Sequence, residues 1–271
     1  DEREAILRVH GRKKPLDDTV DLASVAQRTI GFSGADLENL LNEAALRTAR
    51  RKASTITNED IDEARDRIMM GLERKGIKVT EDERKMIAYH EAGHAVTAAA
   101  LPNTDPVLKV TIIPRGMAMG VTQQEPAEER YVYRRDYLED RIAVMMGGRA
   151  AEDLVFDSMT SGAENDLKQA SQMARRMVTE WGMSEGLANT ALGEGDRNVF
   201  LGEQLSHQRS YSEATAREID EEIKKILHDA FKRTKGLLTK YRDALDKLAE
   251  LLIAEEQVSG AKVKELVAAV G

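Results

Sequence analysis

The feature that most constrains this chain is residues 88–96, which read Ala-Tyr-His-Glu-Ala-Gly-His-Ala-Val. His90 and His94 stand four residues apart, and Glu91 follows the first of them. Residues four apart share one face of an α-helix, so both imidazoles can bind the same ion. Zn²⁺ suits two neutral imidazoles, and the neighbouring glutamate can then act as general base toward a zinc-bound water. The pattern predicts a hydrolytic zinc site; the competing interpretation is two packing histidines on an alanine-rich helix.

The residues around this motif predict the helix that the zinc site requires. Thr80 and Glu83 have the spacing of a capping box, which opens a helix just upstream of His90. The dipeptide Leu101-Pro102 marks its end. Both histidines therefore lie inside a single predicted helix.

A third protein ligand has to come from elsewhere in the chain. None of the other histidines forms a convincing helical ligand pair with the first two; they are His10, His207 and His228. A carboxylate is the better candidate, because residues 160–167 lead directly into a predicted helix and place Glu164 and Asp166 in its first turn. Spacing does not choose between these two acids, and either could instead complement the helix dipole.

Composition favours a mainly α fold and excludes several classes of protein. The chain is 41% hydrophobic but only 4% aromatic, which suits helices packed by aliphatic side chains. Its formal net charge of −8 gives no global attraction for nucleic acid, and the absence of cysteine excludes disulfides and thiolate zinc sites. No apolar run approaches the roughly 18 residues that span a bilayer. The first residue is not methionine, so we expect a piece of a longer protein.

The first part of the chain predicts a small helical bundle. Two capping boxes, Ser33 with Asp36 and Thr57 with Asp60, each precede an amphipathic segment. Helices are predicted over residues 1–10, 20–29, 33–52 and 61–74. The dipeptide Lys75-Gly76 then marks a domain boundary.

The second part predicts a largely helical domain with a small β-sheet or hairpin. Residues 107–122 are rich in β-branched side chains, and they can offer an edge strand to an extended substrate. Further helices are predicted over residues 134–155 with a break near Gly147-Gly148, 164–181, 212–254 and 263–270. Within residues 212–254 we expect a break at Gly236 and a cap formed by Ser210 and Glu213.

Seven stretches resemble, in the same order, the C-terminal part of the FtsH-type ATP-dependent zinc metalloproteases, which are membrane-anchored AAA proteases. They read GFSGADL (31–37), HEAGH (90–94), GGRAAE (147–152), TSGAENDL (160–167), WGMS (181–184), FLG (200–202) and YSEATAREID (211–220). Together they are distributed along nearly the whole chain.

The resemblance implies two domains and a complete set of site residues. Residues 1–75 would be the helical lid of an AAA ATPase module, and residues 76–271 the zinc metallopeptidase domain. The third zinc ligand of the family falls on Asp166, so His90, His94 and Asp166 would hold one Zn²⁺ per subunit, with Glu91 as catalytic base. Part of a nucleotide pocket is also implied, through His10, Gly34 and Ala35.

The resemblance further implies an endopeptidase that degrades unfolded or membrane polypeptides delivered by an AAA unfoldase ring. Such a protein would be a homo-oligomer, a hexamer, on the cytoplasmic side of a membrane, anchored by segments absent from this chain. The chain has no Gly-x-x-x-x-Gly-Lys-Ser/Thr motif, so ATP or ADP should bind only with the missing ATPase core. The alternative is a non-catalytic assembly or interaction module with a structural metal, which a fourth protein ligand would favour.

Overall fold

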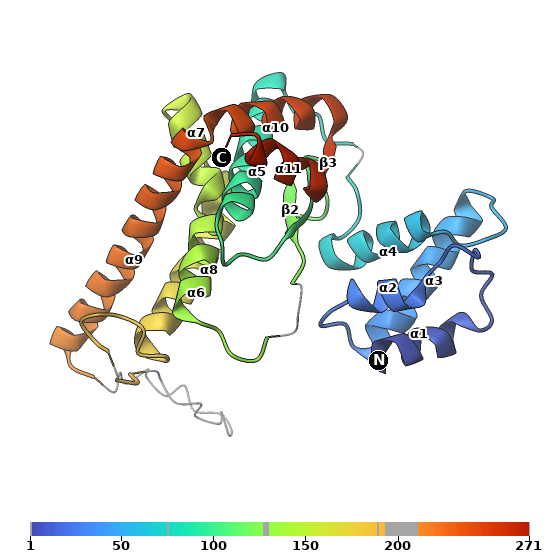
Figure 1. The fold of residues 1–271 in the computed structure, drawn as a ribbon, viewed down its shortest axis with the longest axis horizontal. Helices are drawn as coiled ribbons and strands as arrows, with labels where there is room; N and C mark the ends of the chain where they lie inside the picture. The colour runs from blue at the N-terminus through green and yellow to red at the C-terminus, as the bar shows by residue number, and fades with distance from the viewer. Residues whose placement is uncertain (1, 75, 127–129, 189, 193–210, 271) are drawn as a thin grey trace. The chain divides into compact units, whose positions relative to one another are not determined.

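The computed structural model describes residues 2–74, 76–126, 130–188, 190–192 and 211–270. The FLG segment at 200–202, His207 and Ser210 lie outside this part of the chain. The described residues are mainly helical, with one small sheet, as composition and periodicity predict (Figure 1). In this part of the chain no helix combines the length and apolar character needed to cross a membrane.

The chain divides into two compact units. Unit 1 holds Asp1–Lys78, joined by Ile113–Gly120 and the short segment that starts at Glu125. Unit 2 holds Val79–Ile112, Val121–Gln124 and the rest of the chain from Arg130.

Unit 1 is a small helical bundle, and two of its helices begin at the predicted capping boxes. Its helices are α1 (Glu2–Gly11), α2 (Leu22–Gln27), α3 (Gly34–Arg50) and α4 (Asn58–Met70). Both predicted capping boxes are confirmed: Ser33 and Asp36 cap α3, while Thr57 and Asp60 cap α4. The core consists of aliphatic side chains from these helices and from the α3–α4 connection, including Leu7, Leu37, Leu40, Leu41, Ile56 and Ile61.

Helix α5 (Glu81–Ala100) runs through the interior of unit 2. The capping box of Thr80 and Glu83 opens it, and Leu101 ends it in an extended conformation, as predicted. Its small side chains allow close neighbours: Ala88, Ala92 and Ala95 are fully buried. Helices α7 (Gly147–Phe156) and α10 (Arg242–Glu255) pack against it.

The predicted hairpin is present, and a third strand joins it. Strands β1 (Val107–Thr111) and β2 (Val121–Gln124) pair antiparallel. Strand β3 (Gln257–Ser259) pairs with the other side of β1, so the order is β2-β1-β3. The sequence analysis missed β3, which is too short to carry a recognisable alternating pattern.

The remaining helices complete unit 2. They are α6 (Arg135–Met145), α8 (Glu164–Thr179), which follows the one-turn 3₁₀ helix η1 (Ser161–Ala163), α9 (Glu213–Lys240) and α11 (Gly260–Ala268). Helices α6, α8 and α9 pack pairwise against one another, and α6 gives way to α7 at Met146 and Gly147, close to the predicted break.

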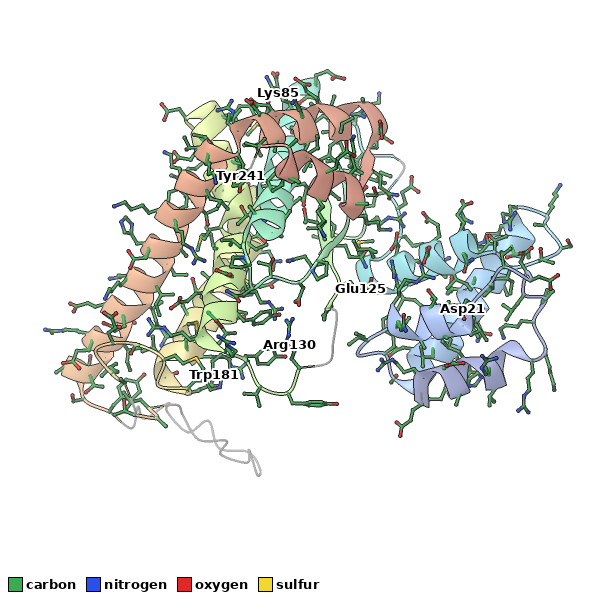
Figure 2. All side chains as sticks on the ribbon, viewed as in Figure 1. Asp21, Lys85, Glu125, Arg130, Trp181 and Tyr241 are labelled. Carbon is green, nitrogen blue, oxygen red and sulfur yellow. The ribbon has the colours of Figure 1, made fainter. Side chains whose placement is uncertain are left out.

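The predicted break at Gly236 is wrong. Helix α9 continues through Gly236, and the chain turns at Tyr241, which is labelled in Figure 2. An exposed glycine costs a helix only about 1 kcal/mol relative to alanine, and the buried side chains of Thr234 and Leu238 hold the helix on both sides of it. The helix starts one residue past Ser212, whose hydroxyl accepts from the Thr215 N–H, so the N-cap is Ser212 and not Ser210.

Candidate metal and catalytic site

Helix α5 presents His90 and His94 side by side, with their Nε2 atoms 3.0 Å apart. The Nδ1 atom of His94 lies 2.7 Å from the carbonyl oxygen of Val144 on α6. A carbonyl oxygen only accepts, so this Nδ1 carries the proton, and in the neutral ring Nε2 keeps its lone pair. The Nδ1 atom of His90 lies 2.7 Å from Oε1 of Glu152 on α7, which orients that ring in the same way.

Asp166 completes the cluster from the first turn of α8. Its Oδ2 lies 3.3 Å from Nε2 of His90 and 3.4 Å from Nε2 of His94. In a tetrahedral zinc site with bonds of about 2.0–2.1 Å, neighbouring ligand atoms lie about 3.3 Å apart. The three atoms thus have the spacing of one face of such a tetrahedron, and the donor set fits Zn²⁺.

Of the two acids in the first turn of α8, Asp166 has the position that favours a metal ligand. Among the described residues, the group able to share an ion consists of His90, His94 and Asp166, and it includes neither Glu164 nor a fourth side chain. Glu164 is exposed. The arrangement leaves one coordination position of a tetrahedral ion without a described protein ligand, as catalytic zinc sites require.

Three glycines allow the helices to approach this closely. A Cβ added at Gly93 on α5 would collide with the carbonyl oxygen of Gly147, and one added at Gly147 would collide with that of Gly93. At Gly148 a Cβ would overlap the ring of His90. The pair Gly147-Gly148 therefore does more than separate two helices: it makes room for the imidazole.

Glu152 contacts the histidine cluster, and the sequence analysis did not single it out by itself. Its side chain is only 2% exposed, and besides the His90 contact it accepts the N–H and hydroxyl of Thr160 at 2.9 and 3.1 Å. It thus ties the ring of His90 to the segment that leads into α8. The available signal was a charged residue on the buried face of an alanine-rich helix, because acids are rarely fully buried without a partner.

Glu91 lies beside the cluster and is buried, with 7% of its surface exposed. Burial raises the pKa of its carboxyl group, while the nearby His94 and His90 act in the opposite direction. The hydroxyl of Thr122 on β2 lies 2.9 Å from Glu91 Oε2. A carboxylate whose pKa is raised toward neutrality is better matched to proton transfer near pH 7.

The same contacts shift the pKa values of two members of the cluster. Burial disfavours the charged form of His90, but hydrogen bonds to Asp166 and Glu152 outweigh it and raise the pKa of His90 to about 10. Although burial acts against it, the pKa of the Asp166 carboxyl is held well below its usual range by hydrogen bonds from the two imidazoles. A bound metal would take the place of protons on these side chains, because zinc ligands bind in their deprotonated forms.

The residues predicted to contact nucleotide lie in unit 1. Gly34 and Ala35 are the first two residues of α3 and are exposed. His10 is near the end of α1, with Nδ1 3.8 Å from Oε1 of Glu38 on α3. The structure thus places these three residues on one pair of packed helices, and their contact with nucleotide stays a prediction.

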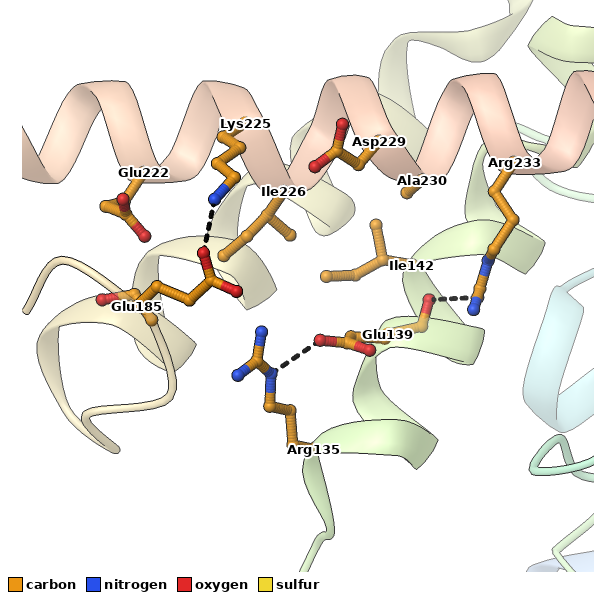
Figure 3. Close-up of a pocket in the computed structure, with 11 residues that line it drawn as sticks. Arg135, Glu139, Ile142, Glu185, Glu222, Lys225, Ile226, Asp229, Ala230 and Arg233 are labelled. Atoms are coloured by element: carbon orange, nitrogen blue, oxygen red, sulfur yellow. Dashed lines mark hydrogen bonds and ion pairs between the residues drawn. The ribbon is translucent and has the colours of Figure 1, made fainter. Parts of the chain in front are cut away.

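A separate cavity of about 230 Å³ lies between α6, α9 and the Ser184-Glu185 segment (Figure 3). Its basic side chains are paired: Lys225 lies 2.7 Å from Glu185, and Arg135 lies 2.7 Å from Glu139. It shares no residue with the histidine cluster.

A buried helix carrying His-Glu-x-x-His, with an aspartate from a second helix and a buried glutamate beside them, is an arrangement typical of zinc metallopeptidases. Comparison with known families agrees. The chain belongs to Peptidase family M41, whose model matches residues 77–266. Residues 19–63 match the model of the AAA+ lid domain.

Individual relatives extend this similarity over nearly the whole chain. It is 57% identical over 265 residues, 98% of this chain and 39% of the relative, to "ATP-dependent zinc metalloprotease FtsH 2" of Salinibacter ruber. It is 52% identical to "ATP-dependent zinc metalloprotease FtsH 4" of Sphaerobacter thermophilus, over 98% of this chain and 40% of that protein. A third relative, "ATP-dependent zinc metalloprotease FtsH" of Pseudothermotoga lettingae, is 47% identical over 97% of this chain and 42% of its own length. The chain therefore spans about two fifths of these relatives.

Proposed function

We propose that the chain is the proteolytic part of an ATP-dependent zinc endopeptidase, together with the lid of its ATPase. One observation carries the proposal: the Nε2 atoms of His90 and His94 and Oδ2 of Asp166 converge beside the buried Glu91. Residues 1–75 would form the lid and residues 76–271 the peptidase domain, in line with the two family matches.

The residues divide the work of peptide hydrolysis among them. His90, His94 and Asp166 hold the ion, and Zn²⁺ supplies Lewis-acid polarisation to such a site when bound. Glu91 accepts a proton from the attacking water while the oxygen of that water bonds to the peptide carbonyl carbon. Glu91 then passes that proton to the amine nitrogen as the C–N bond breaks.

Glu152 and the Val144 carbonyl hold the two imidazoles in the orientation that aims both Nε2 atoms at one point. Such partners of metal-binding histidines typically matter 10–100-fold for metal affinity or activity. The site therefore depends on α6 and α7 as well as on the two helices that carry the ligands.

The substrate we propose is an extended, unfolded polypeptide. In the described residues β2 pairs with β1 on one side, so β2 is an edge strand close to Glu91. An extended chain can add to such an edge through main-chain hydrogen bonds, which tolerate many sequences. This suits unfolded or membrane polypeptides delivered by an unfoldase ring.

The assembly of the whole protein belongs to the same proposal. The relatives are named ATP-dependent, so we propose that the lid works with an ATPase core outside this chain, and that His10, Gly34 and Ala35 line part of the nucleotide site. A hexameric ring, anchored at the cytoplasmic side of a membrane by further segments, would present substrates to the peptidase domain.

The first test is metal content and cleavage of an unstructured peptide by Glu91→Gln, Asp166→Ala and Glu164→Ala variants. Glu91→Gln should retain zinc and lose at least about 100-fold in activity, as general-base removal typically does. Asp166→Ala should lose zinc, whereas Glu164→Ala, in the same helical turn, should keep both zinc and activity. A Glu91→Gln variant that cleaves like the parent would rule out the assigned base. The opposite result at positions 164 and 166 would move the metal ligand.

A further inference from the structure

Thr122 stands between the edge strand and the glutamate that we assign as base. Its Oγ1 lies 2.9 Å from Oε2 of Glu91 and 3.0 Å from the main-chain carbonyl oxygen of the same residue. Throughout the described chain, no other side chain donates a hydrogen bond to the Glu91 carboxylate. The Thr122 hydroxyl is therefore the hydrogen-bond donor that can orient this buried carboxylate.

We propose that Thr122 is a positioning residue for peptide hydrolysis: it holds the Glu91 carboxylate at the angle from which it takes the proton of the attacking water. The proposal rests on the proposed function, since it concerns the base of that reaction. Glu91 has rotatable bonds that its burial alone does not fix, and a misplacement of about 1 Å in a catalytic group can cost about 100-fold in rate.

The sheet holds the main chain of Thr122 in place. Thr122 is in register with Val110 of β1, which is fully buried and is itself opposite Val258 of β3. The hydroxyl thus projects from a strand whose neighbour is paired on both sides. A β-branched side chain also has few χ1 rotamers, so the hydroxyl has little freedom to leave.

The position of Thr122 also links substrate binding to the base. Strand β2 is the edge to which we propose that the substrate adds, and Thr122 belongs to that strand. Main-chain pairing with the substrate does not use the Thr122 hydroxyl. Removing the hydroxyl should therefore lower kcat and leave KM unchanged, a division that a loss of strand structure would not produce.

The test uses the full 271-residue chain loaded with zinc and a short unstructured peptide. Thr122→Val has the shape of threonine without its hydroxyl, and we expect kcat to fall roughly tenfold, as for a lost hydrogen bond to a charged group. Thr122→Ser restores the hydroxyl and should recover kcat to within about twofold. Thr111→Val on β1 is a matched control, because its hydroxyl lies 3.1 Å from the Glu256 carbonyl and not at Glu91.

A structural readout separates positioning from folding. Crystal structures of the zinc-loaded parent and Thr122→Val should show the Glu91 carboxylate displaced in the variant, with β2 and the zinc ligands in place. Thr122→Ala serves the same comparison if Thr122→Val does not fold. An unmoved carboxylate and an unchanged kcat would overturn the role of Thr122, as would an equal loss of kcat in Thr111→Val.

The outcome for Thr122 can be told apart from that for the proposed function. If the zinc-loaded parent does not cleave, or if Glu91→Gln cleaves like the parent, the proposed function fails and the role of Thr122 falls with it. If the parent cleaves, Glu91→Gln does not, and Thr122→Val matches the parent, only the positioning proposal fails.

Discussion

At the scale of single residues, the lack of a side chain at Gly148 matters to the site as much as the proposed metal ligands do. The imidazole of His90 occupies the space in which a side chain at Gly148 would begin. The ring is also hydrogen-bonded to Glu152, so moving it away from a side chain at position 148 would disturb that hydrogen bond. The glycine is thus a condition for aiming Nε2 at the metal position.

We therefore predict that Gly148→Ala lowers zinc affinity by at least about tenfold, the effect expected when the orientation of a metal-binding histidine is lost. Competition against a coloured chelator measures the affinity, and circular dichroism checks that the helices remain. Gly236→Ala is the matched control, because a Cβ there meets nothing within 4 Å. It should leave zinc binding intact and stabilise α9 by about 0.5–1 kcal/mol. Unchanged zinc affinity in Gly148→Ala would contradict this account.

At this scale, the sequence predicts geometry well where that geometry depends on local spacing. A helix places His90 and His94 on one face whatever surrounds it, with Glu91 on the neighbouring position. The choice of Asp166 over Glu164 required the family resemblance, since both acids stand in one helical turn. Glu152 and Thr122 are long-range partners, and nothing in their own segments reveals which side chain they will meet.

At the scale of elements, the capping boxes are the sequence signals that predict structure best. Thr57 and Asp60 illustrate why, because the Asp60 carboxylate accepts from the Thr57 N–H while its buried oxygens also meet Arg47 and Arg51 at 2.6 Å. A cap needs only neighbours three residues away, so the sequence contains all of it. The two arginines, from α3 and its end, add tertiary contacts that the local pattern does not predict.

We predict that Asp60→Asn destabilises unit 1 by about 3 kcal/mol at pH 7, as expected when one partner of a buried ion pair is removed. Burial acts to raise the pKa of Asp60, but the arginines and the cap hold it well below the ordinary 3.8. The carboxylate therefore stabilises the fold above pH 3.8, and this contribution is lost as pH falls through the folded-state pKa. The difference between parent and variant should shrink correspondingly below about pH 4.

Amide hydrogen exchange of α3 and α4 measures this effect inside unit 1. The corresponding change Asp36→Asn removes the charge from an exposed cap for which the structure shows no arginine partner among the described residues. Asp36→Asn should destabilise unit 1 much less than Asp60→Asn does. Equal losses would mean that capping, and not the ion pairs, accounts for the effect of Asp60.

Elements that depend on distant partners are where sequence-based prediction fails. Strand β3 exists because β1 offers it an open edge about 150 residues earlier in the chain. Gly260, next to it, lies so close to the Val107 carbonyl that a Cβ would collide with it, a constraint invisible in the local sequence. Helix α9 likewise passes Gly236 because its packing outweighs a small local preference.

At the scale of the whole molecule, the proposed zinc site draws its ligands from two apolar clusters of unit 2. Unit 2 contains two apolar clusters, one around α5, α7 and α10 and the other around α6, α8 and α9. His90 and His94 come from a helix of the first cluster, whereas Asp166 comes from α8 in the second. Zinc would therefore connect the two clusters directly. Among the described residues, unit 1 contributes no member of this group of proposed ligands.

This arrangement predicts that zinc stabilises unit 2 and leaves unit 1 unchanged. An ion that binds only the folded form at 100 times its Kd adds about 2.7 kcal/mol. The only tryptophan, Trp181, lies just beyond α8, so its fluorescence reports the unfolding of unit 2 in a urea titration. Amide hydrogen exchange reports the unfolding of unit 1. Zinc should shift the fluorescence transition to higher urea, and a chelator should reverse the shift. In Asp166→Ala the shift should vanish. Equal protection of both units by zinc would show instead that they unfold together.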